Sequence, residues 1–127
     1  MFKQLTPVLI VKDVEPCLGF WTGGLGFKKV HEVPGPDGKV MFASVERDGI
    51  EIMYQTSASV SEDNPAIGRS LDGHSIALFI TVENLDEVEK AIAGAPVHKA
   101  RHKTFYGSEE IYVAEPGGNT VGFAQMG

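Results

Sequence analysis

Apolar and polar positions along the chain follow two periodicities, one typical of strands and one typical of helices. Residues 5–11 are apolar and partly β-branched, as in a buried strand, and this run stops at Lys12-Asp13. Asp13 stands where a helix N-cap is expected, and Pro16 suits a first helical turn. Apolar side chains then recur at the spacing of one helix face: Val14, Leu18, Trp21 and Leu25. This part of the chain therefore predicts a strand followed by a helix.

Three further strands are predicted after this helix, over residues 27–33, 40–45 and 50–55. The last two are separated by Arg47-Asp48-Gly49, which is typical of a tight hairpin turn. The first half of the chain therefore has the order strand, helix, strand, strand, strand.

The second half of the chain has the same order of predicted elements. Strands are predicted over residues 74–82, 97–101 and 110–114 and in a last run through Gln125, and Asn84 is placed to cap a helix. A shift of 71 residues lays the second half on the first, for example Val11 on Val82 and Gly23 on Gly94. We therefore expect two modules, at about 1–56 and 74–127, joined by a linker at 57–73. The predicted fold is α+β: two tandem βαβββ modules that form a curled mixed sheet around a central trough, with the helices outside.

Composition and charge narrow the classes of function. The chain has 127 residues, a net charge of −6 and a single cysteine, Cys17, so an internal disulfide is excluded. The acidic balance disfavours nucleic acid as a partner, and the basic stretch 98–103 is interpreted as a solvated strand face. The longest apolar run, 76–82, is too short to cross a bilayer. We expect a cytoplasmic protein with no nucleic-acid or membrane partner.

Two groups of residues resemble motifs of a known superfamily. Phe20-Trp21-Thr22 is followed by Leu25-Gly26-Phe27, and Tyr106-Gly107 leads through Glu109 to Glu115-Pro116-Gly117-Gly118-Asn119. Together they resemble the vicinal-oxygen-chelate superfamily, which includes glyoxalase I, bleomycin-resistance proteins and extradiol dioxygenases. The resemblance covers nearly the whole chain and is closer to the bleomycin-resistance branch. It implies a homodimer that takes a small molecule into its trough.

The resemblance also implies where a metal would be held. Metal-dependent members place four ligands on the first and last strands of the two modules, and these positions correspond here to Thr6, Glu51, Ala77 and Gly122. Of these only Glu51 offers a strong donor, whereas a divalent metal needs three or four. We therefore predict no metal, no cofactor and no catalytic residue. Alternation turns His74 away from residue 77, so a site made from Glu51 and His74 is the weaker alternative.

Two functions remain open at this point. The first is a non-catalytic protein that sequesters an aromatic or cationic small molecule at a dimer interface, and bleomycin-like antibiotic resistance is the associated role. The second is a metal-dependent lyase, isomerase or dioxygenase with an off-pattern metal site. For the first, flat side chains would stack on the ligand and one carboxylate would orient a positive group. The residues predicted to line its trough are Phe42, Glu51, Met53, Phe79, Tyr106 and Tyr112.

Other side chains are interpreted as structural. Cys17 lies in the first predicted helix near its apolar face, where a buried inert thiol is expected. Phe20, Trp21 and Phe27 are expected to pack in the core, and ordinary core packing is also the alternative for Phe79.

Overall fold

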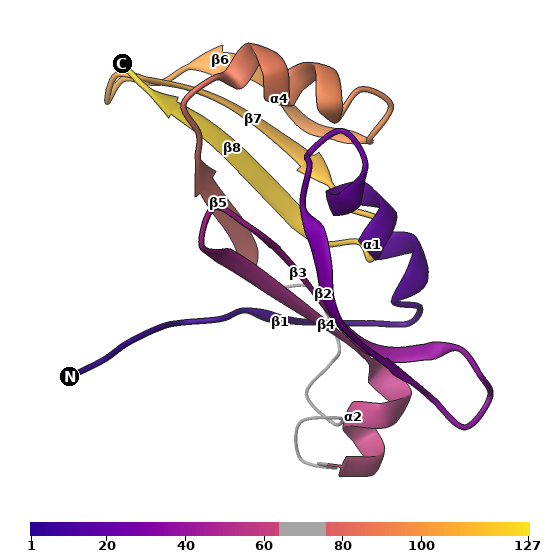
Figure 1. Ribbon diagram of the computed structural model, residues 1–127. Coiled ribbons are helices and arrows are strands. Elements are labelled where there is room, and N and C mark those ends of the chain that lie inside the picture. Colours follow the sequence, from indigo (N-terminus) through magenta and orange to yellow (C-terminus); the bar gives the residue numbers. More distant parts are fainter. Residues whose placement is uncertain (64–75) are drawn as a thin grey trace.

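The structure, a computed structural model that describes residues 1–63 and 76–127, contains two four-stranded sheets (Figure 1). The first sheet has the strand order β1-β4-β3-β2 and the second β5-β8-β7-β6. The strands of the first are β1 (Val8–Val11), β2 (Lys28–Pro34), β3 (Val40–Arg47) and β4 (Ile50–Thr56). Those of the second are β5 (Ala77–Thr81), β6 (Val97–Lys103), β7 (Ser108–Ala114) and β8 (Thr120–Met126).

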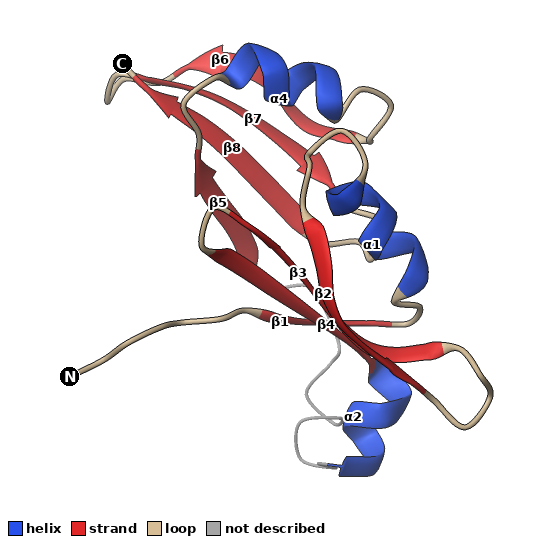
Figure 2. Ribbon diagram, viewed as in Figure 1, coloured by secondary structure: helices blue, strands red, loops and turns tan. Residues whose placement is uncertain are grey.

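One helix covers one face of each sheet (Figure 2). Helix α1 (Glu15–Thr22) packs on β2 and β3, and helix α4 (Leu85–Ala91) packs on β7 and β8. The two tandem βαβββ modules, with helices outside, are thus confirmed. A third helix, α2 (Ser57–Asp63), follows β4 directly, where the sequence predicted only the start of a linker.

The ends of several elements differ from the prediction. β1 begins at Val8 and not at Leu5, although the carbonyl of Pro7 still accepts from the N–H of Met53 at 3.0 Å. The first residues of the chain extend away from the sheet (Figure 1). Helix α1 has Val14 at its N-cap position in place of Asp13. The reason is visible in the backbone: Cys17 and Leu18 both donate to the carbonyl of Val14, at 3.0 and 3.3 Å. In the second module the cap is as predicted, because the side chain of Asn84 accepts from the backbone N–H of Glu87 at 3.2 Å.

Both sheets are mixed, because the first strand of each module runs parallel to the last. Val8 pairs with Met53 in the first module, whereas Ala77 pairs with Thr120 and Phe79 with Gly122 in the second. The two modules therefore differ in register by two residues. Along the sequence a shift of 71 places Thr6 on Ala77 and Glu51 on Gly122, but the strand pairing supports only one of these two correspondences at a time. By strand pairing, the position equivalent to Glu51 is Thr120.

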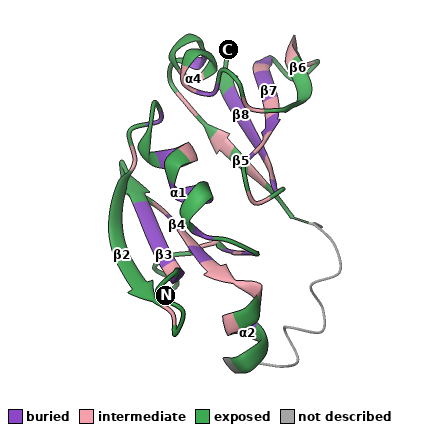
Figure 3. Ribbon diagram, turned by 90° about the vertical axis from the view of Figure 1, so that its right-hand side faces the viewer, coloured by how far each residue is buried: buried purple, intermediate pink, exposed green. Residues whose placement is uncertain are grey.

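The core lies between the sheets and the helices. Trp21 of α1 is fully buried and packs edge-on against Phe20 and Phe27, at ring-centroid distances of 5.1 and 5.0 Å. The buried face of β4 contributes Ile52 and Tyr54, and Figure 3 shows the buried positions gathered on β3, β4, β7 and β8, while β2 is exposed. The predicted core role is confirmed for Trp21, and Phe20 and Phe27 are partly buried against it.

A buried chain of hydrogen bonds joins the two modules. The indole N–H of Trp21 donates to the Tyr54 hydroxyl at 2.8 Å, and this hydroxyl donates to the Glu115 carboxylate at 2.8 Å. Glu115 belongs to the turn between β7 and β8 and also accepts from the backbone and side-chain N–H groups of Asn119, at 2.6 and 2.8 Å. Burial, followed by the charge of Glu115, raises the pKa of Tyr54 far above its ordinary value. The hydroxyl therefore stays protonated and holds the modules together.

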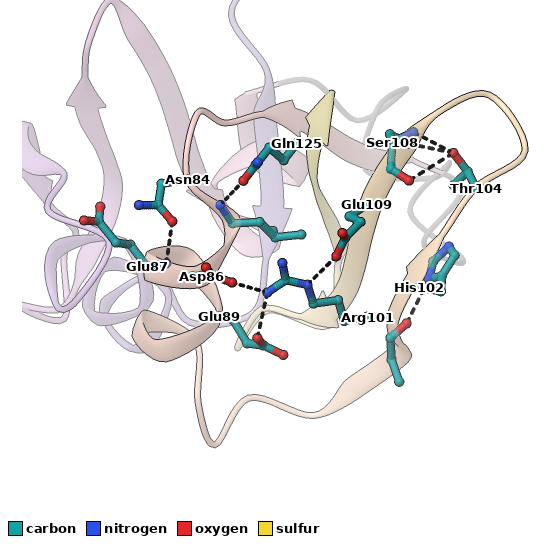
Figure 4. A network of polar contacts seen from close by, with 12 residues as sticks. Asn84, Asp86, Glu87, Glu89, Arg101, His102, Thr104, Ser108, Glu109 and Gln125 are labelled. Carbon is teal, nitrogen blue, oxygen red and sulfur yellow. Dashed lines mark hydrogen bonds and ion pairs between the residues drawn. The ribbon is translucent and has the colours of Figure 1, made fainter. Parts of the chain in front are cut away.

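A second polar network ties α4 to its sheet (Figure 4). Arg101 of β6 binds the carboxylates of Asp86 and Glu89 on α4, at 2.7 and 3.0 Å, and that of Glu109 on β7, at 2.9 Å. Its side chain keeps only 26% of its surface exposed. The prediction that the basic stretch 98–103 is simply solvated is therefore wrong for Arg101, which fixes the helix to the sheet.

Candidate functional site

Each sheet has a second face that its own helix does not cover, and we call these the first and second open faces. The strand pairing assigns Phe42, Glu51 and Met53 to the first open face, because Ile52 and Tyr54 point to the helix side. All three side chains are partly exposed. The predicted alternation at Glu51 is thus confirmed.

The N-terminal segment reaches the edge of the first open face. The side-chain amide of Gln4 donates to the Thr6 hydroxyl at 2.8 Å and to the Glu51 carboxylate at 3.4 Å. Thr6 and Glu51 therefore lie close together, as expected if their positions correspond to two ligands of one metal. Their donors amount to one carboxylate and one hydroxyl.

The second open face is aromatic. Phe79 of β5 and Tyr112 of β7 both pair with Gly122 of β8, one on each side. The Tyr112 ring lies directly over Gly122, so that a Cβ at position 122 would collide with it. Phe79 keeps 51% of its surface exposed and is not a core residue. The alternative of core packing for Phe79 is therefore wrong.

Glu110 is the residue of this face that the sequence prediction missed. Its carboxylate is buried, and three hydroxyls donate to it: Tyr106 at 2.7 Å, Ser108 at 2.7 Å and Tyr112 at 2.8 Å. The hydrogen bond from Tyr106 is the main cause that lowers the pKa of Glu110, and the bond to Glu110 raises the pKa of Tyr112 to about 12. The carboxylate is thus ionised and both phenols are protonated at neutral pH.

Strand β6 adds a basic edge to the second open face. His102 pairs with Glu110 and stacks on the Tyr112 ring, at a centroid distance of 6.3 Å, and Lys99 pairs with Tyr112. Figure 4 shows the His102 ring turned to the backbone, where Nδ1 lies 2.8 Å from the carbonyl oxygen of Ala100. The same close-up shows the Thr104 and Ser108 hydroxyls, 2.8 Å apart, which close the hairpin before β7.

The six predicted binding residues therefore form two groups of three. Phe42, Glu51 and Met53 lie on the first open face, and Phe79 and Tyr112 lie on the second, where Tyr106 folds back to Glu110. A cavity of about 670 Å³ lies between the modules, lined among others by Phe27, Ile80, Val88 and Phe123, and none of the six lines it. The trough predicted from the sequence is thus not this cavity.

The positions that correspond to metal ligands do not fit a divalent metal. Position 122 is a glycine covered by the Tyr112 ring, Ala77 has no donor, and the Thr120 hydroxyl lies 2.9 Å from Nδ1 of His98. Within residues 1–63 and 76–127, no three His, Cys, Asp or Glu side chains come together in a way that could hold a metal ion. His74, the alternative ligand, lies outside the described residues.

Cys17 has the properties of a structural thiol. It is fully buried, and its thiol lies 3.4 Å from the carbonyl oxygen of Asp13. Burial, followed by the charge of Glu115, raises the pKa of Cys17 to about 12. A thiol of this kind is a poor nucleophile.

The relationship to known proteins agrees with this architecture. The model of the Glyoxalase/Bleomycin resistance protein/Dioxygenase superfamily matches residues 3–123. An uncharacterized protein of Mycobacterium bovis is 28% identical over 118 residues, which cover 91% of this chain and 78% of that protein.

Solved structures give the same picture of the fold. A glyoxalase/bleomycin resistance protein/dioxygenase family enzyme from Burkholderia phytofirmans has a TM-score of 0.77 at 17% identity, with 95% of this chain and 96% of that chain covered. A lactoylglutathione lyase from Agrobacterium tumefaciens has a TM-score of 0.71 at 16% identity, with 98% and 94% covered. No helix in the described parts of this chain is long and apolar enough to span a membrane. With a family match over nearly its whole length, the chain belongs to the glyoxalase/bleomycin resistance protein/dioxygenase superfamily.

Proposed function

We propose that this protein binds an aromatic small molecule on its open faces and does not transform it. The observation that carries the proposal is the aromatic second open face, where Phe79 and Tyr106 keep 51% and 56% of their surface exposed beside Tyr112. Exposed aromatic side chains on a rigid sheet offer stacking area at low cost in conformational entropy. The donor sets at the metal positions give no support to a metal-dependent reaction.

A second copy of the chain would complete the trough. In a single chain the open faces carry exposed apolar side chains at Val8, Val33 and Phe79, with 44%, 39% and 51% of their surface accessible. A dimer that brings the two open faces together would gather these side chains into one apolar surface, as is typical of an interface or a binding groove. We therefore propose a homodimer in which the first open face of one chain approaches the second open face of its partner. Sedimentation velocity should then give the mass of a dimer at micromolar concentration, and a monomer would contradict this assembly.

The binding proposal is tested by nuclear magnetic resonance with the probe 2-naphthylmethanol. Addition of the probe should shift the signals of Phe79, Tyr106 and Tyr112. Phe79→Ala should weaken binding at least about fivefold, because one stacked ring is worth about 1 kcal/mol. Val97→Ala is the matched control, because Val97 is similarly exposed, at 57%, but pairs with Val113 on the helix-covered side. Equal losses in the two variants would contradict the proposed site.

Glu51 has a separate role in the proposal, as a carboxylate of the first open face that approaches a ligand amine across the trough of the dimer. Glu51→Ala should weaken 2-naphthylmethylammonium and leave 2-naphthylmethanol unchanged, and Glu87→Ala on the exposed surface of α4 is the control. Unchanged affinity for the ammonium would exclude this role.

Native mass spectrometry on protein purified without a metal-affinity step tests the absence of a metal. A dimer with the mass of two polypeptide chains and no bound ion would agree with the proposed binding protein. One divalent ion per chain would contradict the proposal and would favour a lyase, isomerase or dioxygenase, for which Glu51 and His74 are the first residues to substitute.

A further inference from the structure

The direction of the hydrogen bonds at Glu110 has a chemical consequence for any ligand. An ionised carboxylate only accepts hydrogen bonds, and each hydroxyl has a single proton to donate. The protons of Tyr106, Ser108 and Tyr112 are all used on Glu110, at 2.7, 2.7 and 2.8 Å. The two phenol oxygens can therefore offer a ligand only their remaining lone pairs.

The buried charge also acts through the aromatic rings. Glu110 keeps 1% of its surface accessible, because the hydroxyl groups of Tyr106, Ser108 and Tyr112 cover its carboxylate. A phenol that donates to a carboxylate is polarised toward its ring, which strengthens the attraction of the ring face for a cation. Tyr106 and Tyr112 therefore present both acceptors and electron-rich rings to the second open face.

We propose that Glu110 is the specificity-determining residue of the second open face and that it selects an aromatic ligand that carries a protonated amine. This inference rests on the proposed function, because it names the chemical class of ligand for the same site. An anionic or purely accepting ligand would meet lone pairs and a buried negative charge. A neutral donor would gain the hydrogen bond but not the attraction between charges.

The positive groups of the face indicate where the amine would lie. Lys99 and His102 stand on β6, beside Tyr112 and Glu110. On the other side of β7, strand β8 and then β5 carry Gly122 and Phe79, which have no charge. The amine is therefore expected between Tyr112 and Phe79, and the aromatic body of the ligand over Phe79.

The test compares three probes of one shape: 2-naphthylmethylammonium, 2-naphthylmethanol and 2-naphthoate. Their dissociation constants are measured by nuclear magnetic resonance on the wild type and on Glu110→Gln. The wild type should prefer the ammonium to the alcohol about tenfold, and 2-naphthoate should bind most weakly. In Glu110→Gln the preference should fall to about twofold, because the charge is lost and an amide N–H can donate to a phenol.

Controls separate the inference from the proposed function. Glu109→Gln is the matched variant, because it removes a neighbouring carboxylate that binds Arg101 and not the phenols. An ammonium preference that survives unchanged in Glu110→Gln, or falls equally in Glu109→Gln, overturns the inference and leaves the binding proposal intact. If no probe shifts Phe79, Tyr106 or Tyr112, the binding proposal itself fails.

A second variant keeps the test decisive if Glu110→Gln does not fold. Tyr106→Phe leaves the carboxylate in place. It removes one acceptor oxygen and the polarisation of one ring by Glu110. It should weaken 2-naphthylmethylammonium more than 2-naphthylmethanol, so that the ammonium preference falls about threefold. An unchanged preference in this variant contradicts the inference.

Discussion

Replacing Tyr54 by phenylalanine tests the polar chain that joins the two modules. The substitution removes one hydroxyl from a fully buried ring and leaves its packing in place. Two hydrogen bonds of 2.8 Å are lost, one from the Trp21 indole and one to the Glu115 carboxylate. A neutral hydrogen bond contributes about 1 kcal/mol and one to a charged group about 2 kcal/mol, so we expect a loss of about 3 kcal/mol in the free energy of unfolding.

Urea denaturation followed by tryptophan fluorescence measures this loss directly. Trp21 is the only tryptophan of the protein and is the first donor in this chain of hydrogen bonds. For a domain of this size the melting temperature should fall by about 10 °C. Tyr106→Phe is the control: it also removes one hydroxyl that binds a glutamate, but from a ring that is 56% exposed, and should cost much less. A loss below about 1 kcal/mol in Tyr54→Phe would refute the reasoning, since it would mean that the buried donor and acceptor find other partners.

Three further predictions concern single sites. Gly122→Ala should lower the melting temperature and displace the Tyr112 ring, seen as a change in its nuclear magnetic resonance signals, because the new Cβ collides with that ring; unchanged ring signals would contradict this placement. Since the folded-state pKa of Glu110 is lowered, its contribution to stability is present above the pKa of a free carboxyl and is lost as pH falls through the folded value. In denaturation measured at several pH values, Glu110→Gln should therefore reduce the loss of unfolding free energy at acid pH. Cys17 should react with a thiol reagent at pH 8 only after unfolding, and rapid labelling of the folded protein would contradict its burial.

The sequence pattern predicted the βαβββ order and the open-face position of Glu51, because hydrophobic periodicity and strand alternation are local properties. It also placed Trp21 in the core. The shift of 71 was misleading for β8, since the residue identities between modules are loose and the true pairing is set by hydrogen bonds between β5 and β8. A register slip of two residues keeps every side chain on its face, so alternation cannot detect it.

Glu110 and Arg101 were missed for a different reason. A charged residue in a strand is ordinarily solvated. Arg101 is buried by carboxylates from other elements, whereas the partners of Glu110 lie within four residues of it. A signal was nevertheless present for Glu110: Ser108 and Tyr112, two residues to either side, alternate onto the same face. Arg101 offered no such signal, because Asp86 and Glu89 approach it from α4.

The contact between Tyr54 and Glu115 makes the two modules depend on each other for stability. Each of the two modules supplies one half of this buried pair, so a polypeptide with only the first module would leave the hydroxyl of Tyr54 without its carboxylate acceptor. The first module alone would therefore expose or leave unpaired a hydroxyl that its own residues do not satisfy with a carboxylate, and its fold depends on the second module at this point. Because one polypeptide carries both modules, this contact is intramolecular and does not depend on protein concentration.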